Sequence, residues 1–292
     1  MKAKRFLAVA ATAAVAALSL TGCAASSPAG DGKVTIFGGY GEAQAKAFQA
    51  ELTEFGKANN IEITFTSLAS FDQDIALKIK SGDTPDIAMW PQPGGLKDAS
   101  SNLIPLSDII DLAPIQKTLI PGWDTLAEVD GKVYGLPVSA NMKTLVFYNP
   151  AAFEAAGYTV PTTWDELITL SDKIAADGKI QPWCVGFGSG EATGWVGTDW
   201  MEDIMLRTAS AETYDAWTTH GIPFNDPAVV TAIGEAGKIL KNPKYVGDVA
   251  SIATTTFQDG GAGIVDGTCA MHRQASFIGG ILAADHGAEI VD

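Results

Sequence analysis

The sequence predicts an α/β protein whose mostly parallel sheet is divided between two lobes. Strand-like and helix-like stretches alternate through residues 34–90, a pattern that is typical of βαβ units. A long extended run without helical periodicity follows at residues 135–150 (GLPVSANMKTLVFYNP), and helical patterns resume after it. This run is therefore the best candidate for a segment that crosses from one lobe to the other.

Three short apolar runs predict the strands of the first lobe, and they cover residues 34–37, 61–65 and 86–90. Between the first two runs, Phe48, Leu52 and Phe55 recur at i, i+4 and i+7, the spacing of one helix face. Ile75 and Ile79 stand one turn apart and indicate a second helix before the third strand. The pattern thus predicts strand, helix, strand, helix, strand.

Helix start signals mark the second lobe. Residues 163–166 (TWDE) form a capping box, which opens an amphipathic helix that ends near Gly178. Thr198 and Asp199 are expected to cap a helix over about residues 200–207, and Asp226 followed by proline starts another.

The N-terminus has the organisation of a secretory signal. A basic start is followed by fifteen apolar or small residues at 6–20, too few for a transmembrane helix. Residues 20–23 (LTGC) resemble the lipobox of bacterial lipoproteins, which predicts cleavage before Cys23 and lipidation of its thiol. An ordinary signal with a chance cysteine is the alternative. The expected location is the extracellular face of the cytoplasmic membrane, with a small-residue tether behind the anchor.

The charge balance narrows the class of partner. Removal of residues 1–22 takes away Lys2, Lys4 and Arg5, and leaves 16 basic against 34 acidic residues. An excess of acid repels nucleic acids and other anionic polymers, so neither is expected to bind.

Two cysteines remain after Cys23, and in an oxidising compartment they are most simply read as a disulfide between Cys184 and Cys269. Two separate buried thiols are the alternative. The three histidines have no metal-ligand spacing, so we expect no metal site and no cofactor.

Several stretches occur in an order that resembles a known family. They are the signal with its lipobox, the glycine-rich first turn, and SGDTPDIAMW, GLPVSANMKTLVFYN, AAGYTVPTTWDELITLSDKI, ATGWVGTDWMEDIMLR and CAMHRQASF. Together they resemble the extracellular solute-binding proteins (family 1) of ABC-type sugar importers, in the branch that takes α-glucosides and related oligosaccharides. The resemblance covers essentially all of residues 33–292.

This resemblance implies a two-lobed, periplasmic-binding-protein-like (type II) fold with crossing hinge strands and a ligand between the lobes. The expected divisions are a signal peptide at 1–22, the lipidated cysteine and tether at 23–32, lobe 1 at 33–141, lobe 2 at 142–285 and the start of a return to lobe 1 at 286–292. Family members continue further, so the chain resembles a C-terminally truncated member. We expect no helix after Ile281, and the final AEIVD to begin a strand.

The best candidate sugar contacts lie on a glycine-rich stretch. Sugars need aromatic rings against their C–H faces and polar side chains for their hydroxyls. Trp195 suits a stacking platform, and Asp199 stands one helical turn away to accept hydroxyls. A packing role is the alternative for Trp195. Trp200 is expected to face the core.

Further candidates follow from position and from the resemblance. Ligands of open α/β sheets bind at the carboxyl ends of strands, which places Gly39 and Tyr40 after the first strand and Trp90 after the third. The resemblance adds Gln92 as a further lobe 1 contact.

Three more candidates come from the crossing segment and from the stretch after Cys269. Asn141 and Lys143 lie in the crossing segment, although Lys143 also suits a plain surface lysine. Arg273 offers a guanidinium fork to vicinal hydroxyls, or else pairs with a nearby acid. A disulfide would tie the Arg273 segment to the strand that leads to Trp195.

Two other classes compete with a sugar receptor. A secreted glycosidase would use a pair of carboxylates, and the candidates are Glu191, Asp199, Glu202 and Asp203. Glu202 and Asp203, however, are placed by the sequence in the first turn of a helix, where acids need no catalytic explanation. A binding protein of the same fold for a polyol or another solute is the second alternative.

The sequence thus predicts a non-catalytic, monomeric, lipid-anchored receptor that delivers an oligosaccharide, an α-glucoside by resemblance, to a membrane permease powered by a cytoplasmic ATPase.

Overall fold

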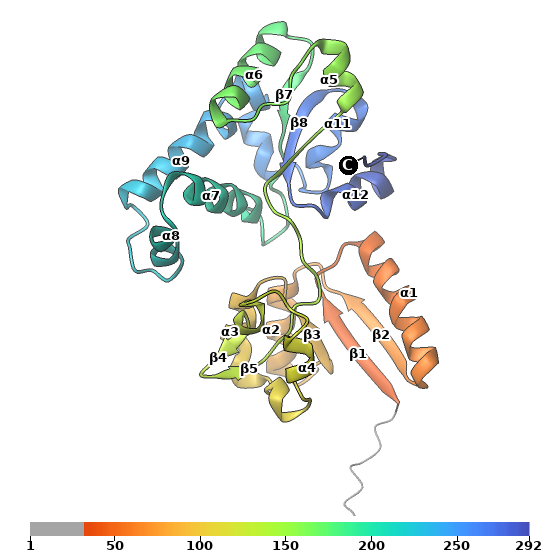
Figure 1. Cartoon of the computed structure of the whole chain (residues 1–292). Helices are drawn as coiled ribbons and strands as arrows, with labels where there is room; N and C mark the ends of the chain where they lie inside the picture. Colours follow the sequence, from red (N-terminus) through yellow and green to blue (C-terminus); the bar gives the residue numbers. More distant parts are fainter. Residues whose placement is uncertain (1–31, 292) are drawn as a thin grey trace, which may run out of the picture.

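The computed structural model describes residues 32–291 and shows two α/β lobes joined by one extended segment (Figure 1). Lobe 1 contains a parallel three-stranded sheet in the order β2-β1-β3. Its strands are β1 (Lys33–Gly38), β2 (Glu62–Ser67) and β3 (Ile87–Met89), and its crossover helices are α1 (Glu42–Asn59) and α2 (Phe71–Ser81). The predicted strand–helix alternation is confirmed.

Short elements complete lobe 1. Helices α3 (Pro93–Ala99) and α4 (Ala113–Gln116) are followed by a two-stranded hairpin of β4 (Glu128–Val129) and β5 (Lys132–Val133). Single 3₁₀ turns occur at Ser100–Asn102, Leu106–Asp108 and Trp123–Thr125. Residues 134–144 then run without helix or strand toward lobe 2, as expected for a crossing segment.

Lobe 2 is built on a mixed sheet in the order β6-β8-β7. The central strand β8 (Cys269–Gln274) pairs in parallel with β7 (Gln181–Cys184) and antiparallel with β6 (Leu145–Tyr148). Its α-helices are α5 (Pro150–Ala156), α6 (Trp164–Asp177), α7 (Trp195–Thr208), α8 (Ala211–Thr218), α9 (Pro227–Leu240), α10 (Pro243–Val246), α11 (Gly263–Asp266) and α12 (Ile278–His286). Its 3₁₀ turns lie at Val249–Ala253 and Asp259–Gly261.

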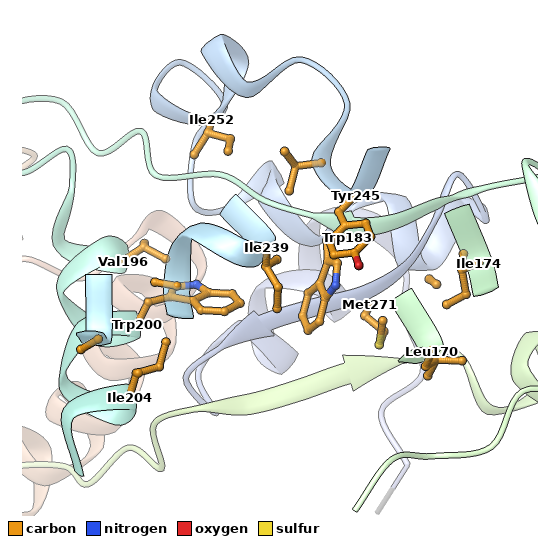
Figure 2. Close-up of a cluster of buried hydrophobic side chains, with 14 of the residues drawn as sticks. Leu170, Ile174, Trp183, Val196, Trp200, Ile204, Ile239, Tyr245, Ile252 and Met271 are labelled. Carbon is orange, nitrogen blue, oxygen red and sulfur yellow. The ribbon is translucent and has the colours of Figure 1, made fainter. Parts of the chain in front are cut away.

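The main core lies in lobe 2, between its sheet and the helices that cover it. Figure 2 shows Trp183 of β7, Trp200 of α7 and Met271 of β8 among aliphatic side chains of the helices. Trp183 is fully buried and donates its indole N–H to the hydroxyl of Ser171, at 2.9 Å. Trp200 is 2% exposed, which confirms that it faces the core.

The capping box is confirmed as well. The hydroxyl of Thr163 accepts a hydrogen bond from the backbone N–H of Glu166, and the Glu166 carboxylate accepts one from the backbone N–H of Thr163. The helix that it opens ends at Gly178, whose φ of 61° suits glycine.

The predicted start of the next helix is wrong. Helix α7 begins at Trp195 rather than near Trp200, because Gly194 takes a φ of 112° and acts as N-cap without a side-chain hydrogen bond. Thr198 and Asp199 therefore lie inside the helix. Glu202 and Asp203 lie in its middle and not in its first turn, so the helix dipole does not account for them.

The expectation for the C-terminus is also wrong. Helix α12 continues to His286, because Ile278 and Leu282 stand one turn apart and are both buried. Residues 287–291 form no strand. They lie beside lobe 2 (Figure 1), and a β-carbon placed on Gly279 would lie 3.6 Å from Ile290. The return to lobe 1 stays a prediction.

The predicted signal, Cys23 and most of the tether lie outside the described residues. Within residues 32–291, no helix has both the length and the apolar character needed to cross a membrane.

Candidate functional site

Trp195 is the first residue of α7 and is half-buried. Its indole meets the ring of Phe257 at a centroid distance of 5.2 Å and that of Phe277 at 6.0 Å. It therefore has apolar neighbours, and the packing role that the sequence left open accounts for part of its surface. The predicted contact between Trp195 and a sugar stays a prediction.

Lys143 links the crossing segment to α7. Its Nζ lies 2.7 Å from Oδ2 of Asp199 and 5.1 Å from the centre of the Trp195 ring. The Asp199 side chain is 12% exposed and that of Lys143 is 40% exposed. Lys143 is thus an ion-paired residue rather than a plain surface lysine. The structure brings three predicted site residues, Lys143, Trp195 and Asp199, into one cluster.

The backbone next to Lys143 is held through its neighbour Met142. Met142 donates its N–H to the hydroxyl of Ser276 at 3.1 Å, and its carbonyl accepts the N–H of Ser276 at 2.8 Å. Thr144 has a φ of 68°, a strained value for a β-branched residue. Two hydrogen bonds and one unusual turn therefore aim the Lys143 side chain at α7.

Arg273 lies on the buried strand β8 and is 6% exposed. One of its terminal nitrogens donates to Oδ2 of Asp203 at 3.0 Å and to the backbone carbonyl of Asp199 at 3.1 Å. The guanidinium also stacks over the ring of Trp200, at 4.5 Å. Burial lowers the pKa of Arg273, whereas Asp203 acts in the opposite direction. The ion pair that the sequence left open for Arg273 is thus present, and it holds α7 against β8.

Glu202 also lies in this region, although it was not among the predicted sugar contacts. It lies on α7, one turn after Asp199, and is partly exposed. Burial raises the pKa of the Glu202 carboxyl, the Asp199 charge raises it further, and Lys143 opposes both. Burial and the nearby carboxylates, chiefly that of Glu202, raise the pKa of Tyr214 on α8. The sequence could have indicated this position, because Asp199 and Glu202 stand three residues apart and so share one face of a helix.

The lobe 1 candidates form a separate group at the carboxyl ends of β1 and β3. Gly39 is exposed after β1, while the Tyr40 ring packs against Phe48 and Phe65 at 5.5 and 5.6 Å. The half-buried Trp90, after β3, meets Phe71 edge-on at 5.7 Å.

Gln92 and Asn141 complete the predicted set. Gln92 is exposed as the N-cap of α3, and Asn141 is exposed in the crossing segment. Among residues 32–291, no hydrogen bond or ion pair joins the lobe 1 candidates to the α7 cluster. Contact of all these residues with one ligand stays a prediction.

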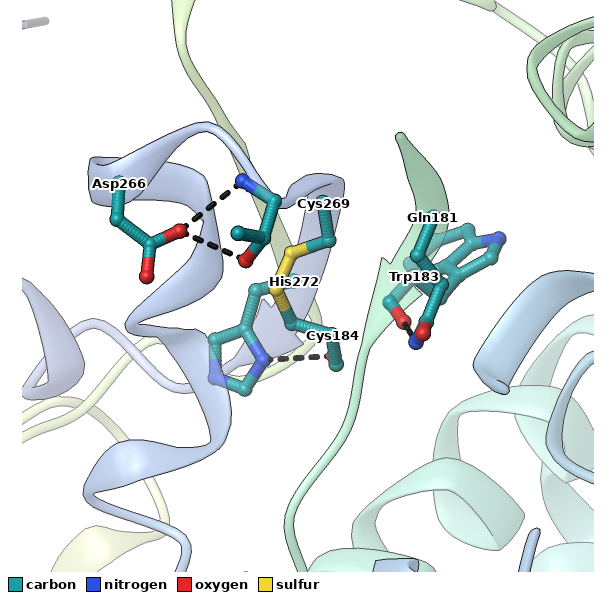
Figure 3. Close-up of a disulfide and its surroundings, with 7 residues drawn as sticks. Gln181, Trp183, Cys184, Asp266, Cys269 and His272 are labelled. Atoms are coloured by element: carbon teal, nitrogen blue, oxygen red, sulfur yellow. Dashed lines mark hydrogen bonds between the residues drawn. A yellow bond between two sulfur atoms is a disulfide. The ribbon is translucent and has the colours of Figure 1, made fainter. Parts of the chain in front are cut away.

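A disulfide joins the end of β7 to the start of β8 (Figure 3). Cys184 and Cys269 are bonded, with their Cα atoms 5.7 Å apart, which confirms the predicted bridge. Nδ1 of His272 lies 3.1 Å from the carbonyl oxygen of Cys184, and burial lowers the pKa of His272 to about 4. The bridge thus ties β8, which carries Arg273, to the strand that leads toward Trp195. An effect on ligand affinity stays a prediction.

In the part of the chain that the structure describes, no three His, Cys, Asp or Glu side chains are arranged to hold a metal ion.

These features define a class of protein, two α/β lobes with a polar and aromatic cluster beside the segment that connects them. Residues 39–271 match the sequence profile of bacterial extracellular solute-binding proteins, and the chain belongs to this family. The family consists of solute-binding proteins rather than enzymes, which removes the support for a glycosidase.

Two relatives share substantial identity with the chain. It is 42% identical to the osmoprotective compounds-binding protein GgtB of Synechocystis, over 96% of this chain and 68% of that protein. It is 40% identical to the alpha-glucosides-binding periplasmic protein AglE of Rhizobium meliloti, over 84% of this chain and 56% of that protein. The chain therefore spans between about half and two thirds of their lengths.

Solved structures support the fold. A chitin oligosaccharide binding protein superimposes with a TM-score of 0.72 at 20% identity, over 88% of this chain and 64% of that one. At this identity the likeness supports the two-lobed fold alone.

Proposed function

We propose that the chain is the receptor of an importer and holds a neutral oligosaccharide, an α-glucoside or a close analogue, between its two lobes. The observation that carries this proposal is the cluster of Lys143, Trp195 and Asp199 at the crossing segment. It combines an aromatic ring with charged hydrogen-bonding groups, as sugar recognition requires. The similarity to an α-glucoside-binding relative supports the same class of ligand.

The mechanism that suits this arrangement is closure about the crossing segment. A ligand that contacts both lobes stabilises the closed form by its differential affinity for that form. On this proposal Lys143 moves least, because Ser276 fixes its neighbour Met142 to lobe 2. Trp90 and Gln92 then approach the ligand from lobe 1, and a permease recognises the closed receptor. Lipidation at Cys23 would keep the receptor at the membrane.

A polyol or a related osmoprotective compound is the second candidate ligand. The relative named for osmoprotective compounds favours it. Such a ligand needs the same hydroxyl-binding groups and less stacking surface.

Isothermal titration calorimetry of the purified mature chain with maltose, trehalose, sucrose, isomaltose, sorbitol and glucose tests the proposal. Trp195→Leu removes the ring while keeping an apolar side chain, and we expect it to weaken disaccharide binding by roughly tenfold. Trp164→Leu is the matched control, because Trp164 lies on α6, which carries no member of the cluster, and its indole N–H donates to Glu235. Saturable binding of sorbitol alone would favour the polyol. Absence of binding by any of the six would refute the proposed class of ligand.

A further inference from the structure

We propose that Glu202 contacts the ligand and selects neutral, hydroxyl-rich solutes against anionic ones. This inference rests on the function proposed above and names the class of solute that the same site accepts. It depends on which charged side chains around α7 form ion pairs, and on the Glu202 carboxylate, which forms none in the described residues.

Every cationic side chain of this cluster already has a carboxylate. Lys143 pairs with Asp199 at 2.7 Å, Arg273 pairs with Asp203 at 3.0 Å, and the more exposed Arg207 shares Asp203 at 2.8 Å. An anionic ligand would therefore have to compete with a carboxylate for each of these cations. Breaking a buried pair leaves a carboxylate without its partner, which is costly.

The Glu202 carboxylate is the exception on the acidic side. Among residues 32–291, no donor gives it a hydrogen bond and no cation lies within ion-pair distance, although Asp199 and Lys143 are close enough to change its pKa. A partly buried carboxylate without protein donors is unfavourable unless a ligand or water supplies them. Sugar hydroxyls are such donors, and their hydrogen bonds to a charged acceptor are strong.

The same carboxylate disfavours anions. A phosphate or carboxylate on the ligand would lie near the like charges of Glu202 and Asp199, while Lys143, Arg273 and Arg207 each already face a carboxylate. A neutral ligand that donates its hydroxyl protons to Glu202 meets no such repulsion. The paired cluster therefore suits neutral donors best.

Calorimetry with matched ligands tests this selection. Maltitol and maltobionate share one disaccharide skeleton and differ in a terminal hydroxymethyl or carboxylate group. We expect the wild-type chain to prefer maltitol to maltobionate by about a hundredfold, and Glu202→Gln to weaken maltitol binding by about tenfold and to reduce the preference by a similar factor. Glu202→Asp keeps the charge, so it should weaken maltitol binding while retaining the preference.

Glu154→Gln is the matched control, since Glu154 is an exposed acid on α5 and its change alters net charge equally. If Glu202→Gln binds both ligands as the wild type does, Glu202 has no such role and the inference is overturned. Tighter binding of choline than of maltitol would also overturn it. If the wild type binds no neutral saccharide or polyol at all, the proposed function itself fails.

Discussion

The two lobes share the α/β plan but differ in how completely they bury their sheets. All six residues of β8 are buried at the centre of lobe 2, whereas β1, the central strand of lobe 1, buries only Ile36 and Gly38. Among residues 32–291, the apolar side chains with no exposed surface, such as Ile174 and Ile239, all lie in lobe 2. Parallel sheets are ordinarily covered on both faces. The difference teaches that lobe 2 holds most of the burial that stabilises this chain.

The lobes also differ in how the N-termini of their helices are capped. In lobe 2, side chains of Asn149, Thr163, Ser210, Asp226 and Asn242 accept hydrogen bonds from the first turns of their helices. In lobe 1, no N-cap side chain of α1 to α4 does so. The candidate site follows this division, because its most tightly bonded members, Asp199 and Arg273, belong to lobe 2. We therefore expect a rigid half-site on lobe 2 and a more mobile one on lobe 1.

Loss of the disulfide should have the largest effect on this contrast. The bridge closes a separation of 85 residues within lobe 2, which corresponds to about 4.5 kcal/mol on the chain-entropy model. We expect Cys184→Ala with Cys269→Ala to reduce the free energy of unfolding of lobe 2 by about this amount. Hydrogen exchange resolved by peptide measures each lobe separately. An equal loss of protection in lobe 1 would contradict the division.

A matched pair of core truncations compares the two interiors directly. Ile174 on α6 is fully buried, and Ile75 on α2 is 3% exposed. Because Ile174 lies in the larger core, Ile174→Ala should cost about 4 kcal/mol and Ile75→Ala about 2 kcal/mol. Denaturant unfolding of each variant gives the change in the free energy of unfolding, and hydrogen exchange assigns that change to a lobe. Equal costs would mean that lobe 1 packs as tightly around α2 as lobe 2 does around α6.

Acid should destabilise lobe 2 through His272. Burial lowers the pKa of His272 to about 4 in the folded chain, against about 6.5 when it is unfolded. Between these values the unfolded chain binds the proton and the folded chain does not, so stability falls as the pH drops from about 6.5 to 4. The contribution lost is up to about 3 kcal/mol.

His272→Gln should flatten the pH dependence in this window, as measured by urea unfolding at a series of pH values. His220→Asn is the control, since His220 is exposed and its φ of 60° is tolerated by asparagine. An unchanged slope in His272→Gln would assign the acid sensitivity to other groups.

The fold was predictable where its signals are local. The strand–helix alternation, the capping box at Thr163 and the buried Trp200 could each be predicted in this way. The disulfide was predictable for another reason, because only two cysteines remain after Cys23. The start of α7 could not, because a glycine N-cap at Gly194 resembles the loop before it.

The site was harder to predict, since its bonds join distant parts of the chain. Arg273 and Asp203 are 70 residues apart, so no spacing rule connects them. The isolation of Glu202 depends on which neighbours are already paired, a property of the folded cluster alone.

The smallest predicted effect concerns one helix cap in each lobe. Thr163 caps α6 through its hydroxyl, which accepts the N–H of Glu166 at 3.2 Å, whereas Ser70 at the start of α2 makes no such bond. Thr163→Ala should therefore cost about 1 kcal/mol. Ser70→Ala should change the free energy of unfolding by less than about 0.5 kcal/mol. Thermal unfolding of the two variants checks this, and equal losses would show that Ser70 caps α2 in solution and that the lobes differ less in their helix termini than in their cores.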